Sequence, residues 1–282
     1  MARRIDVTAA RALSPLGIAL FAAVMFVTAC SAGSSSSRPD EPLLVAAASD
    51  LRPAFTELAS IFTQKTGHEV AFVFGSSGLL AQQAIEGAPF DIYASASADY
   101  VDVVLARGVG DPTTRTTYAY GRITLWTADT ERHPWTSLDD LVTDSTITTV
   151  AIANPAHAPY GLAAKQSLIQ TGIWDDIRPR LVYGANIGDV QRLVTSGNAD
   201  AAILALSLAL AADEHDSGRW MLIDDALHAP LQQELVITAS GPARVAAASA
   251  FLELVASGTG RETLRRYGLL LPGETVLPMA PE

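Results

Sequence analysis

One apolar run that ends in small polar residues constrains the fold of this chain more than any other stretch. Residues 43–48 are uninterruptedly apolar, which is typical of a strand buried within a parallel sheet. Ser49 and Asp50 follow, both of them residue types that cap helices, and apolar side chains then recur at helical spacing as far as residue 66. The sequence therefore predicts a strand that passes directly into a helix, with Ser49 at the junction.

The same alternation continues along the chain and predicts an α/β protein with largely parallel sheets. Two consecutive strand-like runs flank Gly121, and we interpret this glycine as a crossing into a second lobe. A later strand would return the chain to the first lobe. The expected strands are 43–48, 70–74, 90–94, 117–120, 123–127, 148–153, 201–204, 220–223 and 234–238.

These boundaries divide the chain into four parts. Residues 1–29 form a leader, 30–41 a tether, 42–121 together with 230–282 a first lobe, and 122–229 a second lobe. Two α/β lobes joined by two crossings leave a cleft between them. Ligands of open α/β sheets bind beyond the carboxyl ends of the strands, so we expect the functional site in that cleft.

The N-terminal segment has the pattern of a secretory signal. Basic residues precede a largely apolar stretch over residues 13–29, and small residues lead to Cys30. This pattern resembles a bacterial lipoprotein signal, in which cleavage before the cysteine is followed by acylation of its thiol. Residues 31–40 (SAGSSSSRPD) have the composition of a flexible tether. We therefore expect a lipid-anchored protein on the extracytoplasmic face of a bacterial cell membrane, an uncleaved membrane helix being the alternative.

Charge and cysteine content exclude several classes of function. The chain has 19 basic and 30 acidic side chains, a net charge of −11, so it lacks the surplus of cations that a nucleic-acid partner requires. Its single cysteine excludes an internal disulfide and a cysteine-rich metal site. Small anions remain compatible with this charge, because helix N-termini bind them without lysine or arginine. We expect a monomer without a cofactor.

Serines at two strand-to-helix transitions offer hydroxyl and backbone N–H donors. Ser49 follows the first strand, and Ser76 and Ser77 lie in a Gly-Ser-Ser-Gly loop before the next helix. Such donors suit an oxyanion, whose oxygens only accept hydrogen bonds. The alternatives are that Ser49 merely caps its helix and that the loop is an ordinary polar turn. In the second lobe, two further helix starts could present the main-chain N–H groups of Tyr160 and Val190.

Five segments stand in order along the chain: AAAS at 46–49, FGSSGLLA at 74–81, GAPFDIYASA at 87–96, NPAHAPYG at 154–161 and RYG at 266–268. This ordered set resembles the periplasmic molybdate-binding proteins of ABC importers, which have the type II periplasmic binding-protein fold. The resemblance runs from about residue 43 to the end of the chain. It implies a solute-binding lipoprotein that captures molybdate or tungstate, closes by a hinge motion and delivers its cargo to an ABC permease.

The resemblance also implies a binding site. The family holds a tetrahedral oxyanion with neutral donors, and its two serines fall on Ser49 and Ser77, with Ser76 adjacent. Its main-chain donors fall on Tyr160 and Val190. The resemblance implies no catalytic residue, no cofactor and no metal other than the molybdenum inside the bound oxyanion.

One segment departs from the family pattern. Many members carry a tyrosine after a strand of the second lobe, where this chain has Ala205, and an aspartate where it has Leu208. A phenolic donor is therefore lost unless Tyr160 supplies one. The alternative function is the capture of another small anion, such as sulfate, phosphate or an organic anion, by the same fold.

An enzyme and a metal-binding protein agree less well with the residues. The Gly-Ser-Ser-Gly loop lacks the spacing of a nucleophile elbow, and the five histidines form no His-Glu-x-x-His pair. His157 lies near the predicted cleft, where we expect a surface or capping role. Glu214, His215 and Asp216 are consecutive and cannot all face one ion from a helix. The carboxylate of Asp50 is expected to face the N-terminal amides of its own helix.

Overall fold

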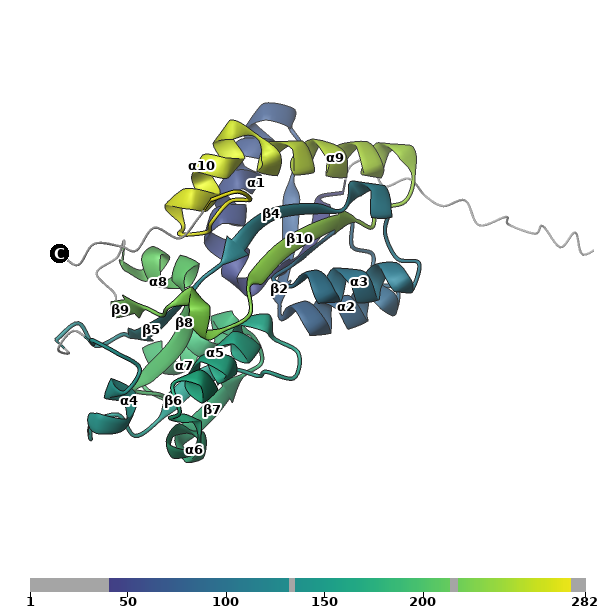
Figure 1. Ribbon diagram of the computed structural model, residues 1–282. Coiled ribbons are helices and arrows are strands. Elements are labelled where there is room, and N and C mark those ends of the chain that lie inside the picture. Colours follow the sequence, from purple (N-terminus) through teal and green to yellow (C-terminus); the bar gives the residue numbers. More distant parts are fainter. Residues whose placement is uncertain (1–40, 132–134, 214–217, 275–282) are drawn as a thin grey trace, which may run out of the picture. The chain divides into compact units, whose positions relative to one another are not determined.

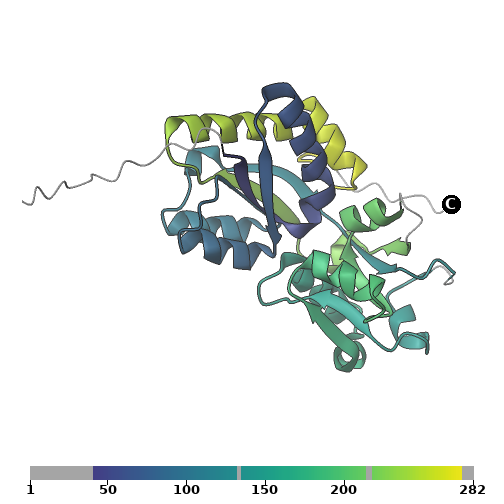
Figure 2. The ribbon, with the colours of Figure 1, turned by 180° about the vertical axis from the view of Figure 1, so that it is seen from behind.

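The computed structural model describes residues 41–131, 135–213 and 218–274, and the statements below concern these residues (Figure 1, Figure 2). The predicted leader, Cys30, nearly all of the predicted tether and the run 214–216 lie outside them. None of the described helices has both the length and the apolar character that a membrane span needs.

The first sheet and its helices come from the two ends of the described chain. The elements are β1 (Leu43–Ala48), η1 (Ser49–Leu51), α1 (Arg52–Thr66), β2 (Val70–Gly75), α2 (Ser77–Ile85), β3 (Ile92–Ser95), α3 (Ala98–Ala106), η2 (Pro112–Thr114), β4 (Thr116–Gly121), β10 (Leu231–Ile237), α9 (Pro242–Ala256) and α10 (Gly258–Arg266). The five strands have the order β2-β1-β3-β10-β4. β1 is parallel to β2 and β3, whereas β10 is antiparallel to β3 and β4.

Helices cover both faces of the first sheet, with α1, α9 and α10 on one face and α2 and α3 on the other (Figure 1, Figure 2). β1 is buried on both faces because its side chains alternate: Val45 packs in the core with α1 and α9, whereas Ala46 packs with α2 and α3. Phe251 of α9 meets Phe55 and Phe62 of α1 edge-on, with ring centroids 5.9 and 5.4 Å apart. This packing fixes the start of α1 next to the end of β1.

The second sheet comes from the middle of the chain. The elements are β5 (Ile123–Thr127), α4 (Asp140–Thr143), β6 (Val150–Ala153), α5 (Pro159–Gln170), α6 (Trp174–Ile177), η3 (Arg178–Arg180), β7 (Leu181–Gly184), α7 (Ile187–Thr195), β8 (Ala201–Ala205), α8 (Leu206–Asp213), β9 (Arg219–Leu222) and η4 (Asp225–Leu227). The five strands have the order β7-β6-β8-β5-β9. β6 is parallel to β7 and β8, and β5 is antiparallel to β8 and β9.

The predicted α/β fold is confirmed, with corrections to its strands. Four of the eight strand pairs are antiparallel, so the sheets are mixed rather than largely parallel. β7 was not predicted because it is a four-residue edge strand whose Tyr183 is 49% exposed. β10 begins at Leu231 rather than at residue 234, because Gln232 and Gln233 interrupt its apolar pattern.

Two connecting segments pass between the sheets. β4 ends at Gly121 and β5 begins at Ile123, and the buried Arg122 between them pairs with Asp225 on the other segment, its Nε lying 3.1 Å from Oδ2. Gly121 has no room for a side chain, since a Cβ there would lie 2.2 Å from the Tyr160 hydroxyl. The two crossings are therefore bonded to each other and closely packed against α5.

Arg244 of α9 joins the start of the described chain to the first sheet. Its guanidinium donates to the main-chain oxygens of Glu41 at 3.0 Å and Pro42 at 3.1 Å, immediately before β1. The same group pairs with the buried carboxylate of Asp91, its Nε lying 2.9 Å from Oδ1. Asp91 Oδ2 also accepts the Leu44 N–H at 2.7 Å. These bonds fix the first residues of β1.

Candidate functional site

Two of the three predicted serines leave the first sheet at the same edge. β1 and β2 are parallel, and Ala48 pairs with Gly75, so Ser49 and Ser76 follow at equivalent positions. Ser49 is 2% exposed, and its hydroxyl donates to the Gly75 carbonyl at 3.2 Å. The register of the two strands therefore brings their serine-bearing loops together.

Ser77 is fully buried at the start of α2. Its Oγ accepts the N–H of Ala96 at 2.9 Å, and its carbonyl accepts the hydroxyl of Tyr93 at 2.8 Å. A serine oxygen that accepts one bond still has its own proton to donate. The bond from Ala96 therefore fixes the side chain while leaving it able to donate to a ligand.

The predicted donors of the second sheet lie in the first turns of α5 and α7. Tyr160 is the second residue of α5, so its N–H has no acceptor one turn earlier in the helix. The Val190 N–H donates to the Asn186 carbonyl at 3.2 Å, and Asn186 Oδ1 accepts the Gly188 N–H at 2.9 Å. A Cβ placed on Gly188 would lie 3.6 Å from Ser49 Cβ, so α7 begins beside Ser49. Of the two predicted main-chain donors, that of Val190 is already engaged within its helix.

His157 connects the loop before α5 to the start of α2. Its Nδ1 lies 2.8 Å from Ser76 Oγ, and its carbonyl accepts the Gly78 N–H at 2.9 Å. The half-buried ring bonds Ser76, the N-cap residue of α2, which lies 81 residues away in the sequence. No local signal in the sequence could have indicated this contact.

Asp50 differs most from its prediction. It is fully buried, and its Oδ2 accepts the Tyr160 hydroxyl at 2.8 Å and the Gln233 amide at 2.6 Å. The expectation that it faces the amides of its own helix is therefore wrong. The Tyr118 hydroxyl donates to Gln233 Oε1 at 3.0 Å and extends the network to β4. The Tyr160 phenol, which could have replaced the tyrosine missing at Ala205, is committed to Asp50.

Burial controls the protonation of this cluster. Loss of solvent raises the pKa of the Asp50 carboxyl from 3.8 to about 6, although the hydrogen bonds from Gln233 and Tyr160 act in the opposite direction. Burial and the neighbouring Asp50 charge raise the pKa of Tyr160 well above its ordinary value. The phenol therefore keeps its proton and remains a donor at neutral pH.

We expect Asp50→Asn to flatten the dependence of the free energy of unfolding on pH. Between the ordinary pKa of 3.8 and the folded-state pKa of about 6, the folded wild type binds more protons than the unfolded chain, so its stability falls as pH rises. The free energy of unfolding of the wild type falls by about 3 kcal/mol across this window. Asp50→Asn lacks this contribution, because an amide does not ionise.

Urea unfolding at about pH 4 and about pH 7 measures the difference. Asp176→Asn, which removes an exposed carboxylate of α6, is the control and should keep the wild-type slope. The same loss of stability in wild type and Asp50→Asn would contradict the assignment.

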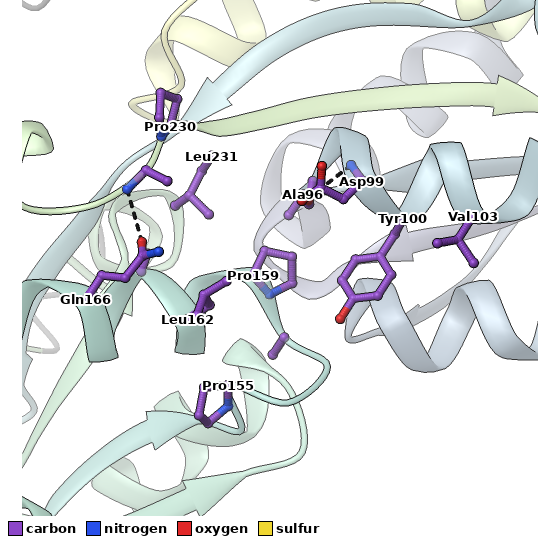
Figure 3. Close-up of a pocket in the computed structure, with 14 residues that line it drawn as sticks. Ala96, Asp99, Tyr100, Val103, Pro155, Pro159, Leu162, Gln166, Pro230 and Leu231 are labelled. Atoms are coloured by element: carbon purple, nitrogen blue, oxygen red, sulfur yellow. Dashed lines mark hydrogen bonds between the residues drawn. The ribbon is translucent and has the colours of Figure 1, made fainter.

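A cavity of about 300 Å³ lies next to these loops (Figure 3). Its wall comes from α3, α5 and the segment before β10, and it includes Tyr100, Leu162 and Leu231. Gln166 Oε1 accepts the Ala229 N–H at 3.0 Å on its border. None of the five predicted binding residues lines this cavity.

The donors gathered around Ser49 and Ser77 are neutral hydroxyl and amide groups. In the three described ranges, no group of three or more His, Cys, Asp or Glu side chains is placed to hold a metal ion. Hydroxyls and helix N-termini suit a small anion that accepts hydrogen bonds.

Comparison with known proteins decides the family. The profile of the bacterial extracellular solute-binding protein family matches residues 43–270. The chain belongs to this family. Membership agrees with the predicted location outside the cytoplasm and with the prediction of binding rather than catalysis.

Relatives of this solute-binding protein include proteins with named solutes. The molybdate-binding protein ModA of Rhodobacter capsulatus is 35% identical over 230 residues, which are 81% of this chain and 87% of that protein. A Bacillus subtilis (strain 168) protein, named putative ABC transporter substrate-binding lipoprotein YvgL, is 27% identical over 89% of this chain and 95% of its own length. The structure of the Azotobacter vinelandii periplasmic molybdate-binding protein matches with a TM-score of 0.75 and 29% identity, over 82% of this chain and 99% of that one. The resemblance predicted from the sequence is confirmed.

Proposed function

We propose that this solute-binding protein captures molybdate, or the similarly sized tungstate, and delivers it to an ABC permease. One observation carries the proposal: relatives that match most of the chain, from Rhodobacter capsulatus and Azotobacter vinelandii, are named molybdate-binding proteins. The neutral donors beside the first sheet support it, because a tetrahedral dianion needs hydrogen-bond donors and not a net positive site.

The proposed site uses donors from both sheets. Ser77 donates through its hydroxyl, and Ser49 would donate through its own after turning its proton away from the Gly75 carbonyl. Ser76 is adjacent, and Tyr160 and Val190 donate through main-chain N–H groups. The contact between Gly188 and Ser49 supports this arrangement, since α7 then starts next to the first serine. The Val190 N–H would have to share its proton between the helix and the anion.

We place the lobe boundaries at the two crossings. Residues 42–121 and 230–282 form one lobe and 122–229 the other, and the assignment of β4 and β5 to different sheets supports this division. The ion pair between Arg122 and Asp225 supports a hinge in which both segments move together.

A lipid on Cys30 would hold the protein at the extracytoplasmic face of the cell membrane. The signal-like residues before the cysteine support the anchor, as does the name of the Bacillus subtilis relative, which is a putative lipoprotein. We propose that the anchored protein acts as a monomer beside its permease.

Calorimetric titration of the purified protein with molybdate, tungstate, sulfate and phosphate tests the function. We expect sub-micromolar binding of molybdate and tungstate, because they share charge, shape and nearly the same size, and no heat from the other two. If none of the four anions gave a heat of binding, the proposal would be contradicted, while the family and the fold would stand.

One observation favours a different anion as the second candidate. Ala205 occupies the position of the family's tyrosine, is fully buried, and pairs with Ile123 of β5. The site then has one phenolic donor fewer, which weakens molybdate binding by roughly 1–3 kcal/mol. Strong binding heats from sulfate, phosphate or an organic anion, with none from molybdate or tungstate, would favour this candidate.

A further inference from the structure

Asp50 is a buried acid directly beside the proposed anion site. We propose that Asp50 determines the charge state that the site accepts: it carries a proton when a doubly charged oxyanion is bound, so capture takes up one proton from solution. The inference rests on the proposed function and adds a coupling between cargo and proton. Ser49 and Asp50 are consecutive residues of η1, with Cα atoms about 3.8 Å apart, and both are buried.

An ionised Asp50 would repel a dianion bound at Ser49. Both positions are removed from water, so solvent and salt screen their interaction weakly. Like charges at neighbouring buried positions favour protonation of one of the two groups. The buried carboxyl takes the proton, because its pKa of about 6 is already raised by burial before any anion arrives.

Among the described residues, the groups that bond Asp50 are neutral. α5 contributes the Tyr160 hydroxyl, β10 contributes the Gln233 amide, and β4 contributes Tyr118 behind that amide. α8 contributes the Ser207 hydroxyl, which donates to the Asp50 carbonyl at 2.8 Å. Burial raises the pKa of both tyrosines well above its ordinary value, so neither becomes charged at neutral pH.

Several charged side chains of the neighbouring elements are engaged elsewhere. Their contacts are Arg52 with the ring of Phe74, Lys165 with the ring of Trp174, Asp189 with Arg192, Arg122 with Asp225 and Glu234 with Arg115. Within the described part of the chain, no cation therefore compensates a negative charge on Asp50.

The two oxygens of the Asp50 carboxyl have different surroundings. Oδ2 accepts both hydrogen bonds, from Tyr160 and Gln233, whereas Oδ1 is buried without a hydrogen-bond partner among the described residues. An unpaired buried oxygen disfavours the ionised carboxylate. The proton belongs on Oδ1, where it leaves both existing bonds intact.

Calorimetric titration of the purified protein with sodium molybdate, at constant ionic strength from about pH 5.5 to about pH 8.5, tests the proposal. We expect the affinity of the wild type to fall by up to tenfold per pH unit above about pH 6, because binding then requires a proton. At about pH 7.5 the heat of binding should vary with the ionisation enthalpy of the buffer and give an uptake close to one proton.

Two variants separate the charge of Asp50 from its role in packing. Asp50→Asn does not ionise, so we expect an affinity that is independent of pH and buffer and tighter than that of the wild type at about pH 8.5. Tyr160→Phe keeps the carboxyl but removes a hydrogen bond that favours its ionised form, so the wild-type transition should move to higher pH. If Asp50 had only a structural role, both variants would keep the wild-type dependence of molybdate affinity on pH.

Two outcomes would overturn the proposal. The first is molybdate binding by the wild type whose affinity and heat do not change with pH or buffer, and the second is a wild-type pH profile in Asp50→Asn. A wild type that binds no molybdate at any pH overturns the proposed function together with the coupling.

Discussion

Ser49→Ala combined with Ser77→Ala is expected to abolish measurable molybdate binding. Each hydroxyl gives one hydrogen bond to a charged ligand, worth about 1.5–3 kcal/mol, so the two together lower the affinity by roughly two to four powers of ten. The main-chain donors of α5 and α7 cannot compensate, because their helices hold them in place. Calorimetric titration with molybdate measures the effect.

The control for this variant must account for a structural bond. Ser77→Ala leaves the Ala96 N–H without its acceptor at 2.9 Å, which costs about 1–3 kcal/mol of stability. Ser167→Ala is the matched control, since Ser167 is also fully buried and donates to the Ala163 carbonyl at 3.0 Å in the middle of α5. It should lose stability and keep its binding. Wild-type affinity in the double serine variant would refute the assignment of both serines.

Gly161→Ala is expected to lower the free energy of unfolding by about 4 kcal/mol or more and to weaken binding as well. A Cβ on Gly161 would lie 2.0 Å from the carbonyl oxygen of Ala153 and 3.0 Å from the carbonyl carbon of Asn154. Both obstacles are backbone atoms at the end of β6, so α5 must move away from the sheet. Tyr160, one residue earlier, would then shift its N–H and its bond to Asp50.

Gly258→Ala separates this steric effect from the general effect of replacing glycine. Gly258 begins α10, and a Cβ there meets no atom within 4 Å. We expect this control to be neutral or more stable by about 0.4–1 kcal/mol, because alanine restricts the unfolded chain. Urea unfolding of both variants gives the comparison, and equal stabilities would show that α5 can move at little cost.

Local chemistry was enough to predict the donors and the elements that present them. The apolar run of β1 and the helical spacing of α1 lie within 24 consecutive residues, Leu43 to Thr66, so no distant information is needed to place Ser49 between them. The prediction of Ser77 is local as well, because glycines and serines follow a short apolar strand. The register of β1 and β2 then places their loops at one edge.

Contacts between distant segments could not be predicted in this way. Asp50 was expected to face its own helix because aspartate is a common cap, yet its carboxylate bonds Gln233, which lies 183 residues away. The start of β10 was missed for the same reason. Its two glutamines are polar and do not indicate a buried strand, but in the structure they pair with β4. His157 and Ser76 are 81 residues apart and carry no sign of their contact.

Tension applied to the chain before Glu41 is carried first by the hydrogen bonds of Arg244 to Glu41 and Pro42, and only then by β1. Part of the force passes through the guanidinium into α9, and part passes through Asp91 into β3 and the sheet. β1 is paired in parallel with β2 and with β3, so tension along it loads the bonds of both ladders in shear, together and not one after another. The domain thus resists a pull from an N-terminal anchor through several bonds that must break at once.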